Sequence, residues 1–536
     1  MAVSAPRRRF DPVWPAAFAA LICAAPLLAV AALAVFGPWT DYMVHLVQTR
    51  LPAYLGNTAL VTIIAAGLAG VIGAPLAWLV ARYAFPGRGV FEWLVALPLA
   101  MPAYAAAYAW YDLTQGFGPL GGYVPTVRGP VGAGIIFAMT LYPYVYLLAR
   151  EAFAGQSADA YDAARTLGES PRGAFLRAAL PLARPAIAAG LALVVMESLA
   201  DYGAVVHLGA PTLSVGLIRA WAGEGATADA ARLAMILVAI AFVLFAVERS
   251  QRRRARQSAP SGKRRPPRRV KLAAPAAALA ILACATPVLL GLVIPMGRLG
   301  ARALSVPLAG DLLQSAGNSL FLAGLSGAVA AVLGLAAAYA LRSGRKRAVF
   351  AARLAGLGYA VPGSVAALGV LALFGLAQGW LDAGWTVLFG GVFPALLTGS
   401  VFALVFAYQS RFAAAAISPA ESALARVTPT LDAASRTLGA GPGETAWRVH
   451  RPLISSGALL AALLVFVEVL KELPATMILR PFNFETLAVA AHNYASDERL
   501  GEAAAPALLI VLIALPPMIW IARRITGGAS GREITK

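Results

Sequence analysis

The sequence predicts an all-α membrane protein with about twelve transmembrane helices in two parallel six-helix repeats. Of its 536 residues, 60% are hydrophobic and only 13% are charged, a composition that excludes a water-soluble globular domain. About twelve apolar stretches approach the roughly 20 residues that a helix needs to cross the hydrocarbon core. Several motifs also recur at one offset along the chain.

The apolar stretches occur along the whole chain, and the first is expected to be a retained span rather than a signal peptide. The expected spans are 14–36, 58–82, 90–111, 131–149, 185–206, 231–248, 273–297, 318–341, 350–376, 387–409, 453–478 and 505–522.

The net charge of +19 follows the expected topology. With the N-terminus inside, cytoplasmic segments hold about 34 of the 44 Lys and Arg residues, as the positive-inside rule predicts. An odd number of spans would scramble this asymmetry, so we expect both termini in the cytoplasm. The basic residues therefore indicate orientation in a lipid bilayer and not binding to nucleic acid.

A basic segment rich in Pro and Ser, residues 250–272, separates two groups of six spans and is expected to be a flexible cytoplasmic linker. Binding of this segment to anionic lipid is the alternative. The first half is residues 1–249, with a core at about 53–249, and the second is 273–536, with a core at about 314–524.

The halves repeat each other. An offset of 271 residues places Glu197 on Glu468 and Asp201 on Glu472, and an offset of about 260 places Met101-Pro102 on Val361-Pro362. Because each half has an even number of spans, the halves run the same way through the membrane. The substrate path is expected to lie between them.

A long cytoplasmic loop follows the fourth span of each half, and its length is typical of a working loop. Each loop predicts a short helix with small residues on one face, a glycine suited to the left-handed position after it, and a second short helix that ends at a proline. The residues concerned are Asp162, Ala163, Ala164, Arg165, Gly168, Leu180 and Pro181 in the first loop, and Ala433, Ala434, Ser435, Arg436, Gly439 and Pro452 in the second.

These loops resemble those of importer-type permeases of the ATP-binding-cassette (ABC) superfamily, which carry a Glu-Ala-Ala pattern followed by Gly and Leu-Pro. Asp162 replaces the Glu in the first copy, and Ala433, Ser435 and Arg451 replace family residues in the second. The resemblance implies a type I ABC importer transmembrane fold in a bacterial inner membrane. It also implies that both loops form coupling helices that dock into ATPase subunits.

The resemblance further implies the partners. Two ABC ATPase subunits, expected as a homodimer, would bind at the cytoplasmic loops and use ATP and Mg. A periplasmic substrate-binding protein would dock at the outer face. The sequence has no Gly-x-x-x-x-Gly-Lys-Ser/Thr motif. We therefore expect a transport subunit that is not an enzyme and that binds no cofactor itself. The four histidines are too few and too scattered to predict a metal site.

Ionisable residues inside predicted spans are costly and indicate pairing or function. They are Glu197, Asp201, Glu468, Lys471 and Glu472, with each acidic pair expected on one helical face. Three hypotheses stay open: structural pairing through Lys471 across the interface between the halves, a gate, or direct handling of a hard cation.

The cargo is indicated only by resemblance. Residues 471–488 are similar to the corresponding stretch of iron(III) importer permeases, which are commonly fused twelve-span chains. Thiamine permeases are also fused, and polyamine, sulfate and phosphonate permeases share the loop. The polar segment 480–499 is expected either to receive a binding protein or to form a lid, and His207, His450 and His492 are interpreted as ordinary loop residues.

Two other classes of membrane protein share some of these features. A major-facilitator-type transporter shares the twelve spans, yet the link between the second and third spans, residues 83–89, lacks the charged motif of that class. A membrane enzyme would need a recurring set of nucleophile, base and orienting group, and no such set is present.

Overall fold

A computed structural model describes residues 13–257, 269–307, 310–391, 393–394 and 397–527. Within these ranges, eleven helices are long and apolar enough to cross a membrane. Two further helical segments, Arg88–Ala100 and Ala103–Thr114, meet at an angle of 88° and bring the number of candidate spans to twelve if the pair counts as one. The predicted all-α membrane fold is confirmed.

The chain divides into two compact units, and each contains part of both sequence halves. Unit 1 comprises residues 1–36 and 317–484. Its helices are α1 (Val13–Phe36), α15 (Leu312–Ser343, from residue 317 onward), α16 (Lys346–Ala355), α17 (Gly363–Phe389), α18 (Val401–Leu424), α19 (Pro429–Thr437), α20 (Pro442–Thr445), α21 (Arg451–Leu470) and α22 (Pro474–Leu479).

Unit 2 comprises residues 37–316 and 485–536. Its helices are α2 (Asp41–Thr49), α3 (Leu51–Arg82), α4 (Arg88–Leu94), α5 (Ala103–Thr114), α6 (Gly129–Ala154), α7 (Gln156–Thr166), α8 (Pro171–Ala174), α9 (Leu180–Ala200), α10 (Gly203–His207), α11 (Leu213–Ile218), α12 (Thr227–Gln257), α13 (Ala274–Val288), α14 (Ile294–Ala303), α23 (Leu487–Ser496) and α24 (Leu500–Gly527).

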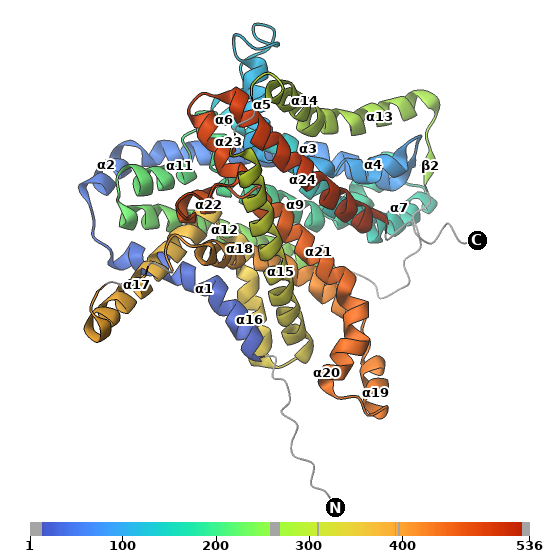
Figure 1. Ribbon diagram of the computed structural model, residues 1–536. Coiled ribbons are helices and arrows are strands. Elements are labelled where there is room, and N and C mark those ends of the chain that lie inside the picture. The colour runs from blue at the N-terminus through green and yellow to red at the C-terminus, as the bar shows by residue number, and fades with distance from the viewer. Residues whose placement is uncertain (1–12, 258–268, 308–309, 392, 395–396, 528–536) are drawn as a thin grey trace, which may run out of the picture. The chain divides into compact units, whose positions relative to one another are not determined.

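The compact units therefore differ from the sequence halves at 1–249 and 273–536. Helix α1 of the first half packs on α16 and α17 in unit 1, where Figure 1 shows it in blue beside them. Helices α14 and α24 of the second half pack on each other and on α5 in unit 2. Hydropathy shows that a helix crosses the membrane but not which helices lie beside it. The sequence therefore could not show that α1 and α14 pack against helices of the other half.

The predicted linker begins and ends with ordered backbone. Helix α12 continues to Gln257, and strand β2 (Val270–Lys271) pairs in parallel with β1 (Tyr83–Ala84) in unit 2. The rest of the predicted linker, residues 258–268, lies outside the described residues. The second half of the sequence is thus preceded by a strand, β2, that pairs with the strand directly after α3.

Several predicted spans are broken or displaced. The stretch 350–376 is broken, because Val361 before Pro362 takes an extended conformation between a 3₁₀ turn (Gly356–Ala360) and α17. The first half breaks in the same way at Met101-Pro102. The stretch 387–409 is displaced, since α17 runs on to Phe389 and α18 starts only at Val401.

Each long loop joins its next span through a π turn. The turns are Phe175–Ala179 and Ala446–His450, which precede Pro181 and Pro452 at the starts of α9 and α21. A proline lacks the N–H that closes the regular turn, so one wider turn accommodates it. The helix continues through this turn, and the expected break at each proline is corrected to a bulge.

Small residues bring the helices of unit 2 together. A Cβ on Gly73 of α3 would lie 2.8 Å from the carbonyl oxygen of Tyr142 on α6, and one on Gly190 of α9 would lie 2.6 Å from Cα of Val145. Close backbone approach of this kind replaces the hydrophobic drive that lipid does not supply. Helices α3, α6 and α9 form the packed centre of this unit.

Candidate functional site

The first of the two predicted loop turns joins α7 to α8 in unit 2. The backbone N–H of Gly168 donates to the Arg165 carbonyl at 3.2 Å, and that of Glu169 donates to Ala164 at 3.1 Å. Gly168 has a φ of +92°, in the left-handed region that favours glycine. This is a Schellman ending, and it confirms the conformation predicted for Gly168.

The second turn, between α19 and α20 in unit 1, has the same bonds at the same offset. Gly439 donates to the Arg436 carbonyl at 3.0 Å, Ala440 donates to Ser435 at 3.1 Å, and the φ of Gly439 is +81°. Both turns also present an apolar tip, because Leu167 is 86% exposed and Leu438 is 87% exposed. The two loops therefore share backbone geometry even where their sequences diverge.

The small residues of the two short helices divide into an outer and an inner set. Ala163, Ala433 and Ala434 are exposed. Ala164 packs on the apolar cluster beneath α7, and its counterpart Ser435 is buried and bonds Thr445 at 2.8 Å. A cavity of about 370 Å³ lies beside α19, between Leu431, Leu438 and Val449.

An arginine at the end of a span ties each short helix to that span. Arg82 of α3 bonds Asp162 at 2.6 Å, and Arg342 of α15 bonds Asp432 at 2.6 Å. The family's acidic position therefore has its counterpart in the second half one residue before Ala433. Sequence reasoning missed Arg82 and Arg342, although the offset of 260 residues between them was available as a signal.

The second loop has additional bonds around this acid. His450 Nε2 lies 2.7 Å from Asp432 Oδ1, and its Nδ1 lies 2.8 Å from the Tyr339 hydroxyl. Burial opposes ionisation of Asp432, but the bonds from His450 and Arg342 outweigh it and hold its pKa below the usual value. His450 is thus part of a network, which corrects its interpretation as an ordinary loop residue.

The expected acidic pairs do not lie on one helical face. Helices α9 and α21 end at Ala200 and Leu470, so Asp201 and Glu472 follow the helices. Each accepts a hydrogen bond from the backbone N–H three residues on, Ala204 at 2.9 Å and Ala475 at 3.3 Å. Each acid lies just before the next short helix and bonds to the backbone of that helix. The acid is therefore not on the same helical face as the glutamate four residues earlier.

The charged partners also differ from the expectation. Lys471, the residue directly after α21, bonds Glu468 of that helix at 3.0 Å. Buried Glu472 bonds Arg411 of α18 at 2.8 Å, a residue that the sequence did not single out. Pairing is therefore present within unit 1, between Lys471 and Glu468 and between Arg411 and Glu472. Pairing of Lys471 across the interface between the halves stays a prediction. Glu197 and Asp201 belong to unit 2.

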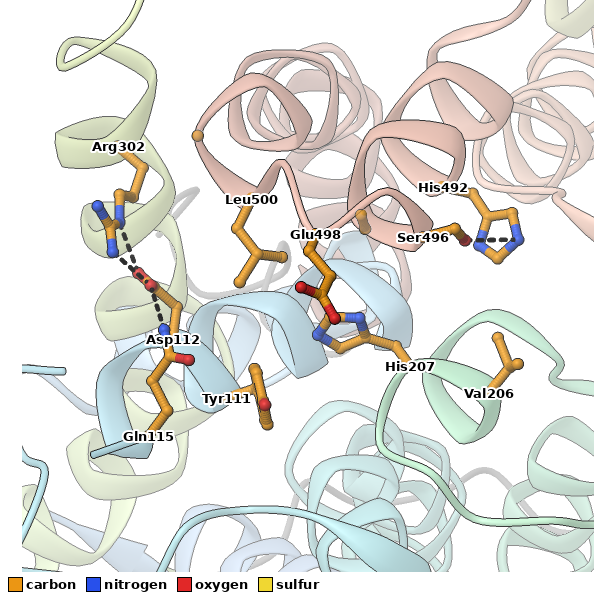
Figure 2. Close-up of a pocket in the computed structure, with 12 residues that line it drawn as sticks. Tyr111, Asp112, Gln115, Val206, His207, Arg302, His492, Ser496, Glu498 and Leu500 are labelled. Atoms are coloured by element: carbon orange, nitrogen blue, oxygen red, sulfur yellow. Dashed lines mark hydrogen bonds and ion pairs between the residues drawn. The ribbon is translucent and has the colours of Figure 1, made fainter. Parts of the chain in front are cut away.

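A polar cavity of about 620 Å³ lies in unit 2, and we call it the histidine cavity. Figure 2 shows side chains from four short segments around it. It is lined by Tyr111, Asp112, Gln115, Val206, His207, Arg302, His492, Ala495, Ser496, Glu498, Leu500 and Gly501. From the sequence, His207 and His492 are interpreted as ordinary loop residues with no link between them, because 285 positions separate them.

Both imidazoles are held by aromatic rings. His207 packs edge-on against Tyr108 and Tyr111, with ring centroids 4.5 Å and 5.2 Å away, and His492 packs against Tyr202 at 5.5 Å. Both lie in short helices outside the candidate spans. Burial lowers the pKa of each to about 4, so both are neutral at pH 7.

The segment 480–499, expected to be either a docking loop or a lid, contains the helix α23. Thr486 caps it, and residues 487–492 are buried. Most of the helix therefore packs inside unit 2, which agrees with the lid. Within the described residues, no group of three His, Cys, Asp or Glu side chains could hold a metal ion.

Comparison with known proteins shows which family this architecture is similar to. Residues 63–256 match the family described as the binding-protein-dependent transport system inner membrane component. An Fe(3+)-transport system permease of Haemophilus influenzae is 26% identical over 481 residues, covering 88% of this chain and 90% of the relative. The match spans both halves.

Two other relatives match over shorter lengths. A sulfate transport system permease of Escherichia coli is 29% identical over 36% of this chain and 71% of its own length. A probable molybdenum ABC transporter permease of Haloferax volcanii is 32% identical over 34% of this chain and 70% of its own length. With its duplicated spans and paired turns, the chain belongs to the family of binding-protein-dependent transport system inner membrane components and is a fused, two-half ABC permease.

Proposed function

We propose that this permease moves ferric iron across the bacterial inner membrane, from a periplasmic binding protein, at the expense of ATP hydrolysed by two separate subunits. The match to the Fe(3+) permease carries the cargo assignment, because it covers 88% of this chain and 90% of that relative. The sulfate and molybdenum relatives each cover about a third of this chain, at 36% and 34%.

The two cytoplasmic turns are proposed as the contacts for the ATPase subunits, which would bind ATP and Mg. Exposed Leu167 and Leu438, at the tips of Gly-ended helices, offer matching apolar knobs to two copies of one partner. A displacement of either short helix would be transmitted to α3 or α15. Arg82 of α3 bonds Asp162 of the first short helix, and Arg342 of α15 bonds Asp432 of the second. With the turns facing the cytoplasm, both termini lie inside.

The ion pairs of unit 1 favour a structural role over a gating role. Glu472 is satisfied by Arg411 and by a backbone N–H, and Lys471 by Glu468. Pairs of this kind compensate the cost of charge in the membrane. Glu197 and Asp201 stay candidates for the transport path on the side of unit 2.

Growth under iron limitation tests the cargo. An in-frame deletion is expected to slow growth specifically in iron-chelated medium and to abolish uptake of radioactive ferric iron, with recovery when the gene is returned on a plasmid. Added thiamine, sulfate or molybdate should not restore growth. Rescue by one of these nutrients, with normal iron uptake, would assign that nutrient as the cargo instead.

A further inference from the structure

A second cavity, of about 370 Å³, lies in unit 1 where α1 begins beside the turn between α15 and α16. We call it the basic cavity, and it is lined by Val13, Trp14, Arg345, Lys346 and Arg347. Helix α1 packs along α16, as Figure 1 shows, and Val13 contacts a buried cluster of alanines from α1, α15 and α16. The cavity is therefore formed by helices that pack on one another within unit 1.

The basic cavity lies at one end of two membrane spans. Both α1 and α15 are candidate spans, and the cavity is lined by the first residues of α1 and by residues directly after α15. Arg342 of α15 bonds Asp432 in the short helix of the second loop, so the second loop lies at this end of α15 too. Because the second turn is proposed to face the cytoplasm, the cavity lies at the level of the inner-leaflet headgroups. The inference rests on the proposed function for this orientation alone.

Part of the cavity lining is cationic. Arg345, Lys346 and Arg347 are consecutive in the sequence, and all three are exposed. Within the described residues, Lys346 and Arg347 have no acidic partner, and the first turn of α16 contains no acidic residue. Like charges this close repel each other, so an anion bound in the cavity would be stabilised.

The rest of the lining is apolar and continues along α1. Trp14 is 77% exposed, and Phe18 and Leu21 are 59% and 61% exposed. Their spacing of four and three residues places them on one face of α1. A soluble anion would use only the cationic part of this surface. A phospholipid would use both parts, because it joins a phosphate to long apolar chains.

We propose that the basic cavity binds an anionic phospholipid of the inner leaflet. The lipid phosphate accepts bonds from Lys346 and Arg347, the Trp14 ring lies at the membrane–water interface, and an acyl chain follows the exposed face of α1. Basic pockets between transmembrane helices on the cytoplasmic side are suited to such headgroups. A zwitterionic lipid has the same phosphate but adds a cation of its own, so it binds the basic cavity more weakly.

Native mass spectrometry of the purified full chain tests this site. The permease in detergent is titrated with phosphatidylglycerol or with phosphatidylcholine, and the bound lipids are counted. The wild type is expected to bind phosphatidylglycerol about ten-fold more tightly than phosphatidylcholine. Lys346→Gln with Arg347→Gln should retain one phosphatidylglycerol fewer, and Trp14→Ala should weaken the same binding step because it removes the apolar part of the lining.

Two control variants separate the cavity from general surface charge and from folding. Arg353→Gln with Arg426→Gln removes two exposed arginines of unit 1 that do not line the cavity, and should leave lipid binding at the wild-type level. Lys346→Arg with Arg347→Lys keeps both charges and should retain the lipid. Equal losses from the two glutamine variants, or equal binding of the two lipids by the wild type, would overturn the site.

Glycerol 3-phosphate distinguishes a lipid from a soluble anion, because it has the phosphate without acyl chains. It is expected to leave the bound phosphatidylglycerol in place at millimolar concentration. Displacement of the lipid by glycerol 3-phosphate would indicate a site for a soluble phosphate and would overturn the assignment to a lipid. The assay contains no iron, so its failure would leave the proposed cargo unchanged.

Discussion

Replacing Gly168 and Gly439 together with valine is expected to abolish ATP-driven uptake and association with the ATPase subunits while membrane insertion stays normal. Their φ angles are +92° and +81°, where a β-branched residue is strained by roughly 1–3 kcal/mol. A Cβ at either position meets nothing within 4 Å, so the fault would be confined to the turn. Opening the turn would displace the exposed tip at Leu167 or Leu438.

Two controls separate the turn from a general effect. Asparagine tolerates the left-handed region, so Gly168→Asn with Gly439→Asn should retain much of the uptake. Gly443→Val places the same side chain on the same loop, in open space and without a positive φ, and should be close to wild type. Co-purification of the valine variant with its ATPase at the wild-type ratio would contradict the coupling role.

Arg411→Met is expected to destabilise unit 1 by about 3–5 kcal/mol, because it removes the guanidinium partner of a buried carboxylate. The Arg411 to Glu472 distance is 2.8 Å, and both side chains are under 10% exposed, at 8% and 6%. Adding Glu472→Gln should recover most of the loss, since the amide oxygen can still accept the Ala475 N–H without a buried charge.

Thermal unfolding in nanodiscs measures this cycle. The matched control is Arg448→Met, because Arg448 and Glu444 form a pair at a similar 3.0 Å with exposures of 76% and 44%. Such a surface pair contributes at most about 1 kcal/mol. Equal losses from Arg411→Met and Arg448→Met, or no recovery in the double variant, would show that the buried pair does not stabilise the unit.

Hydropathy and the internal repeat predicted most of the fold. Some predictions failed for reasons that are local in the sequence, and others failed because they depend on contacts between distant segments. Proline at 102 and 362 broke two predicted spans, because a residue before proline avoids the helical conformation. The exchange of α1 and α14 between units was beyond reach, because an apolar helix satisfies the membrane equally beside any neighbour with small residues.

The turns were predictable because their geometry is local. Gly168 and Gly439 end their helices through bonds that reach only a few residues back. The tethers from Arg82 to Asp162 and from Arg342 to Asp432 join residues 80 and 90 positions apart. The histidine cavity needs segments from both sequence halves, so spacing along one half could not indicate it.

Iron transport out of reconstituted proteoliposomes tests the central claim most directly. The permease is reconstituted with its ATPase subunits facing outward and its iron-loaded binding protein enclosed, and release of ferric iron to the outside is followed. Release is expected only with ATP and Mg outside, and it should vanish in the Gly168→Val, Gly439→Val variant. Iron movement driven by an ion gradient, without ATP or the ATPase subunits, would contradict an ATP-driven importer.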